Sequence, residues 1–325
     1  MSPEYFHLWN VKRMKPDAFK PYDLSSESHT GLLWVFEGIT SYYDDLALLR
    51  AGLINEASYL ELIGRTITRV LRGAGRKRQS VAESSYDAWT RFYKQDANGP
   101  NAIVSYYAKG SLVALALDLK LRAETSNAVS LDDCMRECWR RYGETGTGMP
   151  EDGFEAVCTE LSGLDLGDFF DATVRGTGEL PLEQLLGSHG IDMRLRAATS
   201  RGDAGGKAPP NSGAPVVSLG ALLRTVDGRL EFASIANGGS AENAGVAPGD
   251  VAVALDGIAL TEANVDSRLK GLRVNDRADL VVFRGDELLT LPMTFRAAPE
   301  DTCWLAPSSD VDAEVEGRRA AWLSG

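Results

Sequence analysis

A segment rich in Gly, Ala and Pro at residues 201–215 most constrains the fold, because it separates two stretches with different hydrophobic periodicity. Before it, apolar residues recur at helical spacing, as at Leu60 and Ile63. The run at 110–121 is apolar nearly all round, as expected of a helix at the centre of a lobe. Composition of the kind found at 201–215 is typical of flexible linkers. We therefore predict a mostly helical domain at 1–200, a linker at 201–215 and a second domain after it.

The second domain is predicted to be small and rich in β-strands. Short apolar runs alternate with turn dipeptides such as Asp227-Gly228 and Pro248-Gly249. The expected strands are 216–223, 230–235, 251–255, 280–283 and 288–295, and the expected helices are 240–244 and 262–272. The domain thus covers 216–297, and we expect the tail at 298–325, with Trp304 and Trp322, to pack back onto a domain. The expected fold class is α+β and multidomain.

Charge and composition limit the classes of partner. The 325 residues carry a formal net charge of -12, which disfavours nonspecific binding to nucleic acid or to an anionic membrane surface. The basic run Arg76-Lys77-Arg78 follows glycines and is interpreted as a solvated loop. No apolar run reaches the roughly 18 residues of a transmembrane helix, and no signal segment opens the sequence. The compartment is left open, with the cytoplasm as the expectation.

Cysteine usage argues against a disulfide framework. Four cysteines in a chain of 325 residues are too few to staple a fold. Cys134 and Cys138 lie at i, i+4 spacing on a predicted helix, but no second pair lies nearby in the sequence. We therefore expect buried thiols and not a metal site at this pair.

The first candidate for catalytic chemistry is the segment from Glu4 to His7. In the pattern H-E-x-x-H, two histidines on one helix face bind zinc, and the glutamate between them acts as general base. Pro3 stands where the first histidine belongs. His7 can offer an imidazole and Glu4 can take a proton from water, but this segment alone cannot supply both histidine ligands. His29 is an alternative source of the lost ligand.

Glu37 is the candidate for a further ligand on a second helix. It is a lone acid in the apolar, helix-like run at 33–43. A carboxylate in such surroundings needs a metal, a cation or a hydrogen-bond partner. We interpret Glu37 as a zinc ligand that lies beside the Glu4–His7 segment, and the alternative is an ion pair with Lys12 or Arg13.

Two tyrosines precede the apolar helix that begins near residue 110. A phenol directed at a substrate carbonyl can donate a hydrogen bond to the oxygen as negative charge develops there. Tyr107 is the first choice for this role and Tyr106 the second. The alternative is that both are amphipathic core residues.

Together these segments resemble the glycyl aminopeptidase family of zinc metallopeptidases. The resemblance rests on the order of five motifs, at 4–13, 34–43, 106–110, 164–170 and 175–181. It implies a gluzincin-like catalytic lobe, a C-terminal PDZ domain and the removal of small N-terminal residues, Gly or Ala, from peptides. It also implies that His7 and Glu37 bind zinc, that Glu4 is the general base and that Tyr107 stabilises the transition state.

The chain departs from this family pattern at its start. Pro3 replaces the first zinc ligand, and the upstream part with its β domain has no counterpart, so we interpret the sequence as N-terminally truncated. Loss of a residue that merely orients a metal ligand lowers affinity or activity by about 10- to 100-fold. Loss of a ligand should lower them further, so zinc is expected to be weakly bound or absent and activity impaired.

The PDZ-like module offers a different function. Its resemblance to the family covers 238–250 and the turn at 255–257. The backbone N–H groups of Leu219, Gly220 and Ala221 are predicted to bind the C-terminal carboxylate of a peptide that adds a strand to the sheet edge. The alternative function is thus a non-catalytic peptide-binding protein. The predicted partners are peptides or protein termini, with no nucleic acid and no membrane span.

Overall fold

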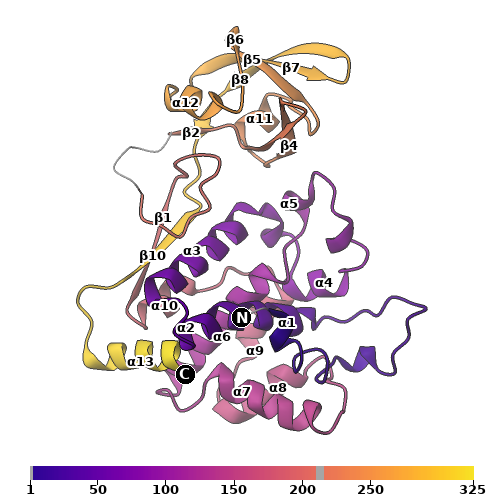
Figure 1. Cartoon of the computed structure of the whole chain (residues 1–325), viewed down its shortest axis with the longest axis vertical. Helices are drawn as coiled ribbons and strands as arrows, with labels where there is room; N and C mark the ends of the chain where they lie inside the picture. The colour runs from indigo at the N-terminus through magenta and orange to yellow at the C-terminus, as the bar shows by residue number, and fades with distance from the viewer. Residues whose placement is uncertain (1–2, 210–215) are drawn as a thin grey trace.

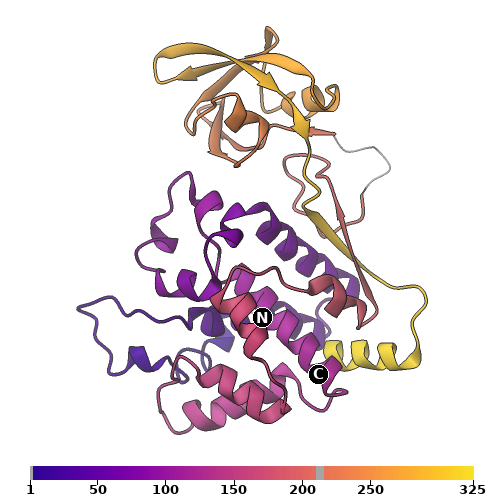
Figure 2. The ribbon, with the colours of Figure 1, turned by 180° about the vertical axis from the view of Figure 1, so that it is seen from behind.

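The computed structural model describes residues 3–209 and 216–325. Helices occupy most of the first part of the chain, here called the helical lobe, and antiparallel strands form the second, here called the PDZ-like domain (Figure 1). The two lie at opposite ends of an elongated molecule, as the view from behind also shows (Figure 2). Each has its own hydrophobic core. The predicted α+β class is confirmed.

The helical lobe is built around α6 (Ala108–Glu124), in which nearly every residue is buried. An all-round apolar helix is stable only where neighbours cover every side, and α2 (Ile39–Arg50), α3 (Glu56–Arg72) and α10 (Leu182–Gly187) pack on it. The other helices of the lobe are α1 (Pro3–Phe6), α4 (Val81–Tyr86), α5 (Gly99–Ala102), α7 (Leu131–Cys138), α8 (Gly153–Ser162) and α9 (Gly167–Phe170). Shorter 3-10 turns are η1 (Asp17–Phe19), η3 (Ala74–Lys77) and η4 (Phe92–Lys94), and π-helical turns are η2 (Trp34–Gly38), η5 (Trp139–Gly143) and η6 (Asp171–Arg175).

The start of α7 shows how local sequence sets a helix boundary. Ser130 accepts a hydrogen bond from the backbone of Asp133, whose carboxylate accepts one from the Ser130 backbone N–H at 2.9 Å. This capping box satisfies two backbone donors that a helix start leaves free. The apolar face of α7 then buries Cys134 and Cys138, and all four cysteines are buried and free.

The PDZ-like domain is an antiparallel sheet with two short helices. The sheet has the order β3 (Ala221–Val226), β4 (Arg229–Ile235), β5 (Val251–Leu255), β7 (Arg277–Arg284) and β8 (Glu287–Thr294), with β6 (Ile258–Ala259) paired to β5. A separate pair joins β2 (Val217–Ser218) to β9 (Arg296–Ala297), and the helices are α11 (Ser240–Asn243) and α12 (Val265–Lys270). Leu230 and Phe232 on β4 and Leu280 and Val282 on β7 alternate with more exposed residues, so one face of the sheet forms the core.

The predicted strand at 216–223 is divided in two. Gly220 has φ +67°, a left-handed conformation that ends β2 before β3 begins. A Cβ at Gly220 would lie 2.6 Å from the Cα of Gly239, so the two glycines allow close contact between the loop and the start of α11. The apolar pattern did not reveal this break, because Leu219 and Leu223 on either side of it both face apolar neighbours.

The last part of the chain returns to the helical lobe. β10 (Thr302–Pro307) pairs antiparallel with β1 (Ile191–Arg196), a strand inside the region predicted to be mostly helical. Cys303 of β10 is buried, and its N–H donates to the Thr68 hydroxyl of α3 at 2.8 Å. The final helix, α13 (Ala313–Ser324), packs on α2 and α6 and buries Trp322 completely.

The predicted linker at 201–215 lies only partly within the described residues, because 210–215 fall outside them. The described section is packed against the helical lobe. A Cβ on Gly206 would meet the backbone oxygen of Glu61 at 2.4 Å, and the Gly206 N–H donates to the Cys303 carbonyl at 2.8 Å. Glycine at 206 therefore permits close packing on α3, where composition had suggested flexibility.

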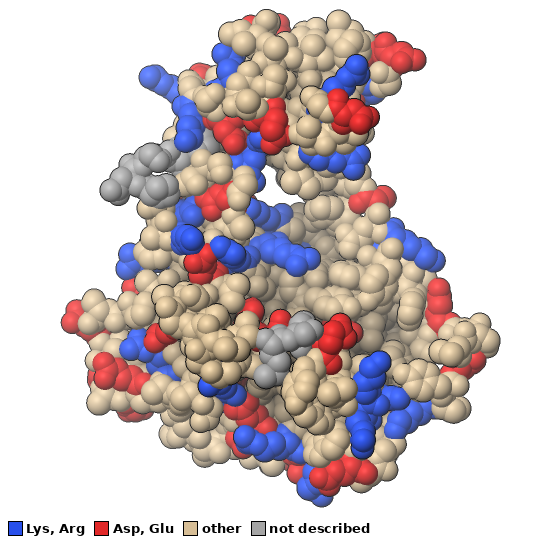
Figure 3. Space-filling model, viewed as in Figure 1, with Lys and Arg blue, Asp and Glu red and all other residues tan. Residues whose placement is uncertain are grey.

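Hydrogen bonds and ion pairs between described residues join the PDZ-like domain to the rest of the molecule. The buried Asn101 of α5 donates to the Ile235 carbonyl at 2.6 Å and accepts from the Asn237 N–H at 3.1 Å. Arg201 forms ion pairs with Glu262 and Asp266 near α12. On the face in Figure 3, acidic and basic side chains are interspersed over both parts of the molecule.

Candidate metal centre

The centre of the candidate site is a contact between His7 and Glu37. His7 Nε2 lies 3.2 Å from a carboxylate oxygen of Glu37, and the side chains are 12% and 23% exposed. The other ring nitrogen of His7 lies 2.9 Å from the backbone carbonyl of Asn10. The carbonyl holds a proton on Nδ1, and a proton on Nε2 then faces Glu37, where a metal ion could take its place. In this structure the ion-pair partner of Glu37 is therefore His7, and not Lys12 or Arg13.

The charge of Glu37 determines the protonation of His7. The hydrogen bond to Glu37 raises the pKa of His7, and burial opposes this with a smaller effect. Glu4 contributes to the same rise. Glu4 is exposed on α1, which ends at Phe6, so His7 lies in the following turn and not on a continuing helix. The structure thus brings Glu4, His7 and Glu37 into one electrostatic environment.

Asn10 connects the two segments of this contact. It is completely buried, and its Nδ2 donates to the carbonyls of Val35 and Phe36 at 3.0 and 3.3 Å. These carbonyls belong to η2, the π-helical turn that carries Glu37. Because a π turn shifts the regular helical hydrogen bonds, a side-chain donor here fixes the turn. The backbone of Asn10 positions His7, and its side chain positions the turn of Glu37.

A close backbone contact brings Tyr107 to the same region. A Cβ on Gly38 would lie 2.6 Å from the carbonyl carbon of Gly110, so η2 and α6 touch at a point that only glycine permits. Glu37 directly precedes this contact, and Tyr107 is the N-cap residue of α6. The negative charge of Glu37 contributes to a raised pKa of Tyr107. The carboxylate therefore lies near enough to the phenol to act on it electrostatically.

Tyr107 belongs to a cluster of three phenols. The Tyr93 hydroxyl lies 3.0 Å from the hydroxyls of both Tyr106 and Tyr107. Burial, and then the hydrogen bond to Tyr93, raises the pKa of Tyr107 well above its ordinary value, so the phenol stays protonated at neutral pH. Tyr106 is 1% exposed and Tyr107 is half-buried. If Tyr106 donates to Tyr93 and Tyr93 to Tyr107, the Tyr107 proton remains available for another acceptor.

The described residues do not assemble a complete set of ligands. Within 3–209 and 216–325, no group of three or more His, Cys, Asp or Glu side chains is arranged to hold a metal ion. His29 does not join the site, because its Nδ1 lies 2.9 Å from the Tyr86 carbonyl and its ring packs on Tyr86. The third histidine, His189, is buried between Leu185 and Trp322.

The pair that is present nevertheless fits zinc. Zinc takes His nitrogen and carboxylate oxygen at about 2.0–2.2 Å, and tetrahedral angles then place two donors about 3.4 Å apart. The observed separation of 3.2 Å is close to this spacing. Zinc-binding histidines commonly donate their other N–H to a backbone carbonyl, as His7 does to Asn10. His7 and Glu37 therefore suit two of the positions around the metal.

Comparison with known proteins agrees with these features. Residues 1–113 match the sequence model of the M61 glycyl aminopeptidase family. The chain is also similar to the crystal structure of an aminopeptidase N family protein from Idiomarina loihiensis, with 38% sequence identity and a TM-score of 0.92 over 99% of this chain. The resemblance to the glycyl aminopeptidase family is confirmed. No curated protein sequence matches the chain.

The similarity to the Idiomarina loihiensis structure covers only part of that protein. This chain covers 54% of the length of the Idiomarina loihiensis structure. The chain also matches an HtrA-type protease, AlgWS227A with a decapeptide, at 16% identity and a TM-score of 0.26, over 28% of this chain and 31% of that chain. None of the helices in the described residues has the length and apolarity of a bilayer-spanning helix.

The predicted peptide-binding loop lies far along the chain, between β2 and the edge strand β3. Leu219 is buried, and its carbonyl accepts the N–H of Ala241 at 2.8 Å. The Gly220 N–H donates to the Ser218 hydroxyl at 3.0 Å, so one of the three predicted donors has an internal partner. Ala221 begins β3 and pairs with Ile235.

The functional residue that sequence reasoning missed is Asn10. Its signal was an amide within an otherwise aromatic and apolar stretch, directly after the segment from Glu4 to Trp9. A polar side chain in such a setting is either exposed or fully hydrogen-bonded. The sequence could show that Asn10 needs either solvent exposure or hydrogen-bond partners, but it could not identify the carbonyls of a π turn as the acceptors.

Proposed function

We propose that this chain is a zinc-dependent aminopeptidase of the glycyl aminopeptidase type whose metal affinity and activity are lowered by Pro3. The observation that carries the proposal is the 3.2 Å contact between His7 Nε2 and the Glu37 carboxylate. The electrostatic effect of Glu37 on Tyr107 supports it. By resemblance, the substrates are peptides with Gly or Ala at the N-terminus.

Each residue has a distinct role in this proposal. Zn²⁺, when bound, polarises a substrate carbonyl and lowers the pKa of water. His7 and Glu37 hold two of its coordination positions, with the His7 ring oriented by the Asn10 carbonyl. Glu4 removes a proton from the attacking water. The protonated Tyr107 donates a hydrogen bond to the oxygen that becomes negative.

Pro3 explains why the activity should be weak. A proline has no side-chain donor for a metal, so the segment that begins with Pro3 and Glu4 contributes only His7 as a ligand. Catalytic zinc sites generally use three protein ligands. The proposal therefore predicts weak zinc binding and slow hydrolysis in this chain.

The test is hydrolysis of glycyl-p-nitroanilide at a zinc concentration that saturates the protein, with zinc occupancy measured in the same samples. The Glu4→Gln variant should keep its zinc but lose about 100- to 10,000-fold in kcat/KM, as expected for loss of a general base. The exposed Glu316→Gln on α13 is the matched control and should hydrolyse at the original rate. Hydrolysis that is unchanged in zinc-loaded Glu4→Gln would refute the proposed role of Glu4.

One observation favours a second candidate function, which is peptide binding by the PDZ-like domain. β3 is the edge strand of its sheet, and Leu222 on it is 61% exposed. An edge strand can pair with an extended peptide. A labelled peptide with a free C-terminus should bind more tightly than its amidated form, and Gly220→Asp should abolish the difference. Equal binding of both peptide forms to the unaltered chain would exclude carboxylate recognition.

A further inference from the structure

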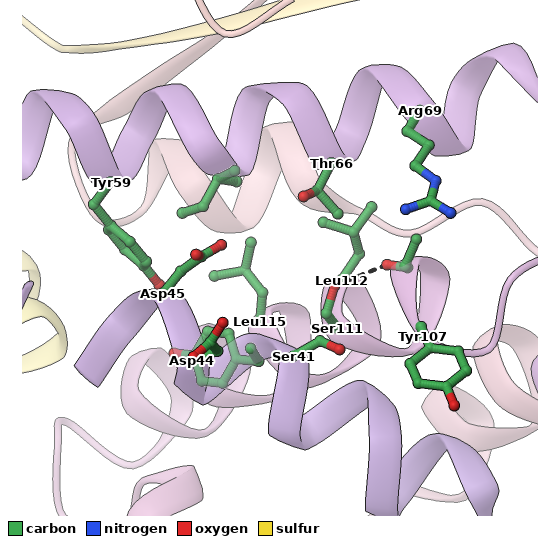
Figure 4. A pocket seen from close by; sticks show the side chains of 13 residues that line it. Ser41, Asp44, Asp45, Tyr59, Thr66, Arg69, Tyr107, Ser111, Leu112 and Leu115 are labelled. Carbon is green, nitrogen blue, oxygen red and sulfur yellow. Dashed lines mark hydrogen bonds between the residues drawn. The ribbon is translucent and has the colours of Figure 1, made fainter. Parts of the chain in front are cut away.

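A pocket lined by both polar and apolar side chains lies between α2, α3 and α6, next to the candidate metal centre. Its volume is about 230 Å³, below the roughly 300–1,000 Å³ of pockets for drug-sized ligands. Tyr107 lines one end, and the acidic pair Asp44 and Asp45 lines the other (Figure 4). The pocket thus extends along α2 away from Glu37, and its size suits a molecule of only a few bonds.

The acidic end is partly desolvated. Burial raises the pKa of Asp44, and burial followed by the nearby charge of Asp44 raises the pKa of Asp45 to about 6. Neither carboxylate forms an ion pair with a described Lys, Arg or His, and the buried Oδ1 of Asp44 has no hydrogen-bond partner within the described residues. Two close, partly buried carboxylates that no described Lys, Arg or His pairs with can still accept positive charge from a ligand.

A third polar group points to a ligand independently of this acidic pair. Tyr59 on α3 is 1% exposed, and its hydroxyl makes no hydrogen bond of good geometry within the described residues, although the Tyr42 hydroxyl lies close to it. The neighbouring Tyr42 hydroxyl donates to Asp118 and accepts from Trp322 Nε1. Figure 4 shows the Tyr59 side chain reaching from α3 to the acidic end of the pocket. Buried hydroxyls are normally satisfied, so this one is available for a ligand.

The opposite end of the pocket carries a positive charge. Arg69 on α3 lines it, is exposed and has no ion-pair partner among the described residues. Figure 4 places its guanidinium on the side of Tyr107, away from the two carboxylates. Between the two ends, the wall is formed by apolar side chains of Ile63, Leu112 and Leu115.

We propose that this pocket binds a small zwitterion, either a free amino acid or a dipeptide. Its ammonium group would contact Asp44, Asp45 and the Tyr59 hydroxyl, and its carboxylate would contact Arg69. The apolar wall would accept a small side chain. An anion such as phosphate fits poorly because of the acidic end, and a simple cation would leave Arg69 and the apolar wall unused.

This binding does not depend on hydrolysis or on zinc, and it adds a ligand site to the proposed function. The test is therefore calorimetric titration of L-alanyl-L-alanine into the full chain in buffer with EDTA, so that no metal-dependent reaction consumes the dipeptide. Free L-alanine is titrated in parallel to establish which length fits. Acetyl-alanyl-alanine lacks the ammonium, and alanyl-alanine amide lacks the carboxylate, so each tests one end of the pocket.

The unaltered chain should bind one of the two zwitterions, and blocking either end of that ligand should raise Kd at least about 10-fold, the scale of a lost charge-assisted hydrogen bond. Asp45→Asn and Arg69→Gln should have effects of the same size. Tyr59→Phe, which removes only the oxygen atom, should raise Kd about 3- to 10-fold. Arg65→Gln, an exposed site on the same helix outside the pocket, is the control and should bind normally.

Several results would overturn the proposal. No binding of either zwitterion by the unaltered chain would do so, and so would equal binding of the acetylated or amidated forms. Binding that persists in both Asp45→Asn and Arg69→Gln would place the ligand elsewhere. Thermal unfolding of each variant distinguishes a lost ligand contact from a lost fold, and Tyr59→Phe tests the site with the least structural change. Failure of this binding would leave the Glu4-dependent hydrolysis untouched.

Discussion

At the scale of single residues, some residues of the candidate site can be recognised from the sequence and others cannot. His7 and Glu37 could be predicted because their residue types and surroundings indicate zinc chemistry, and the structure brings them to 3.2 Å. Asn10 could not, because its role is to satisfy the carbonyls of Val35 and Phe36. Backbone acceptors carry no signature in the sequence.

Replacement of Asn10 by Ala should weaken both the fold and the site. It removes one donor from each of the carbonyls of Val35 and Phe36, of which Phe36 keeps the Thr40 hydroxyl, and we expect the free energy of unfolding to fall by about 1–3 kcal/mol. Because His7 and the turn of Glu37 lose their common support, zinc affinity should fall by about 10- to 100-fold. Chemical denaturation and chelator competition measure the two effects. Asn243→Ala, on α11 in the PDZ-like domain, should leave zinc affinity unchanged.

His189 should make the stability of the protein depend on pH. Burial lowers its pKa in the folded state below the ordinary value near 6.5, and its Nε2 has no hydrogen-bond partner among the described residues. Below about pH 6.5 the unfolded chain therefore binds a proton that the folded chain resists. Stability is fully present above this pH and decreases as the pH falls toward the lower pKa of the folded state.

The measurement is the free energy of unfolding of the unaltered chain and of His189→Gln between pH 7 and pH 5. The slope of stability against pH should be smaller in the variant, by up to about 1.4 kcal/mol per pH unit. Comparing slopes removes the effect of the substitution on packing. Identical slopes would show that His189 titrates alike in the folded and unfolded chain.

At the scale of secondary structure, close backbone packing places the elements of the site. The contact between Gly38 and Gly110 allows η2 to touch α6, which brings Glu37 and Tyr107 together. The periodicity of 110–121 predicted a buried helix correctly, since an all-round apolar pattern has few other solutions. It could not show which backbone lies against it, because two glycines far apart in the sequence determine that contact.

Gly38→Ala should therefore be costly. Its Cβ would lie 2.6 Å from the carbonyl carbon of Gly110, which forces the two elements apart. We expect a loss of about 1–3 kcal/mol, the usual range for overpacking. Gly317 in α13 has open space around its Cβ position, so Gly317→Ala should instead stabilise the protein by about 0.5–1 kcal/mol. Similar thermal melting of both variants would contradict the inferred contact.

The strands show where sequence patterns fail at this scale. The strands predicted at 280–283 and 288–295 form the hairpin of β7 and β8, in which Arg284 pairs with Glu287. The break at Gly220 and the strand β1 were missed. β1 is stabilised by pairing with β10, more than 100 residues later in the chain, and no local pattern reports such a partner.

At the scale of the whole molecule, Asn101 joins the helical lobe to the PDZ-like domain. It belongs to α5, shortly before Tyr106 and Tyr107, and it hydrogen-bonds to the loop at Ile235 and Asn237. The sequence predicted two domains from their periodicities. It could not predict this contact, because the partners of Asn101 are backbone groups at the end of β4 and in the loop after it, which carry no signature in the sequence.

Asn101→Ala should free the loop of the PDZ-like domain. The Asn237 N–H loses its acceptor, so its hydrogen exchange should accelerate at least about 10-fold. The Ala241 N–H, which donates to the Leu219 carbonyl within the same domain, should keep its protection. Hydrogen exchange resolved by residue distinguishes the two. Faster exchange at both amides would mean that the domain itself has been destabilised.

The most direct test of the account is the zinc affinity of the unaltered chain beside Pro3→His, measured by chelator competition at neutral pH. If His7 and Glu37 already form two parts of a zinc site, restoring the missing imidazole should raise zinc affinity by at least about 10-fold. This bound is conservative, because it is taken from the effect of losing a residue that only orients a ligand. Glu37→Gln should remove this gain. Equal zinc affinity in the unaltered chain and in Pro3→His would contradict the claim that His7 and Glu37 lack only a further ligand at position 3. The same holds if neither protein binds zinc.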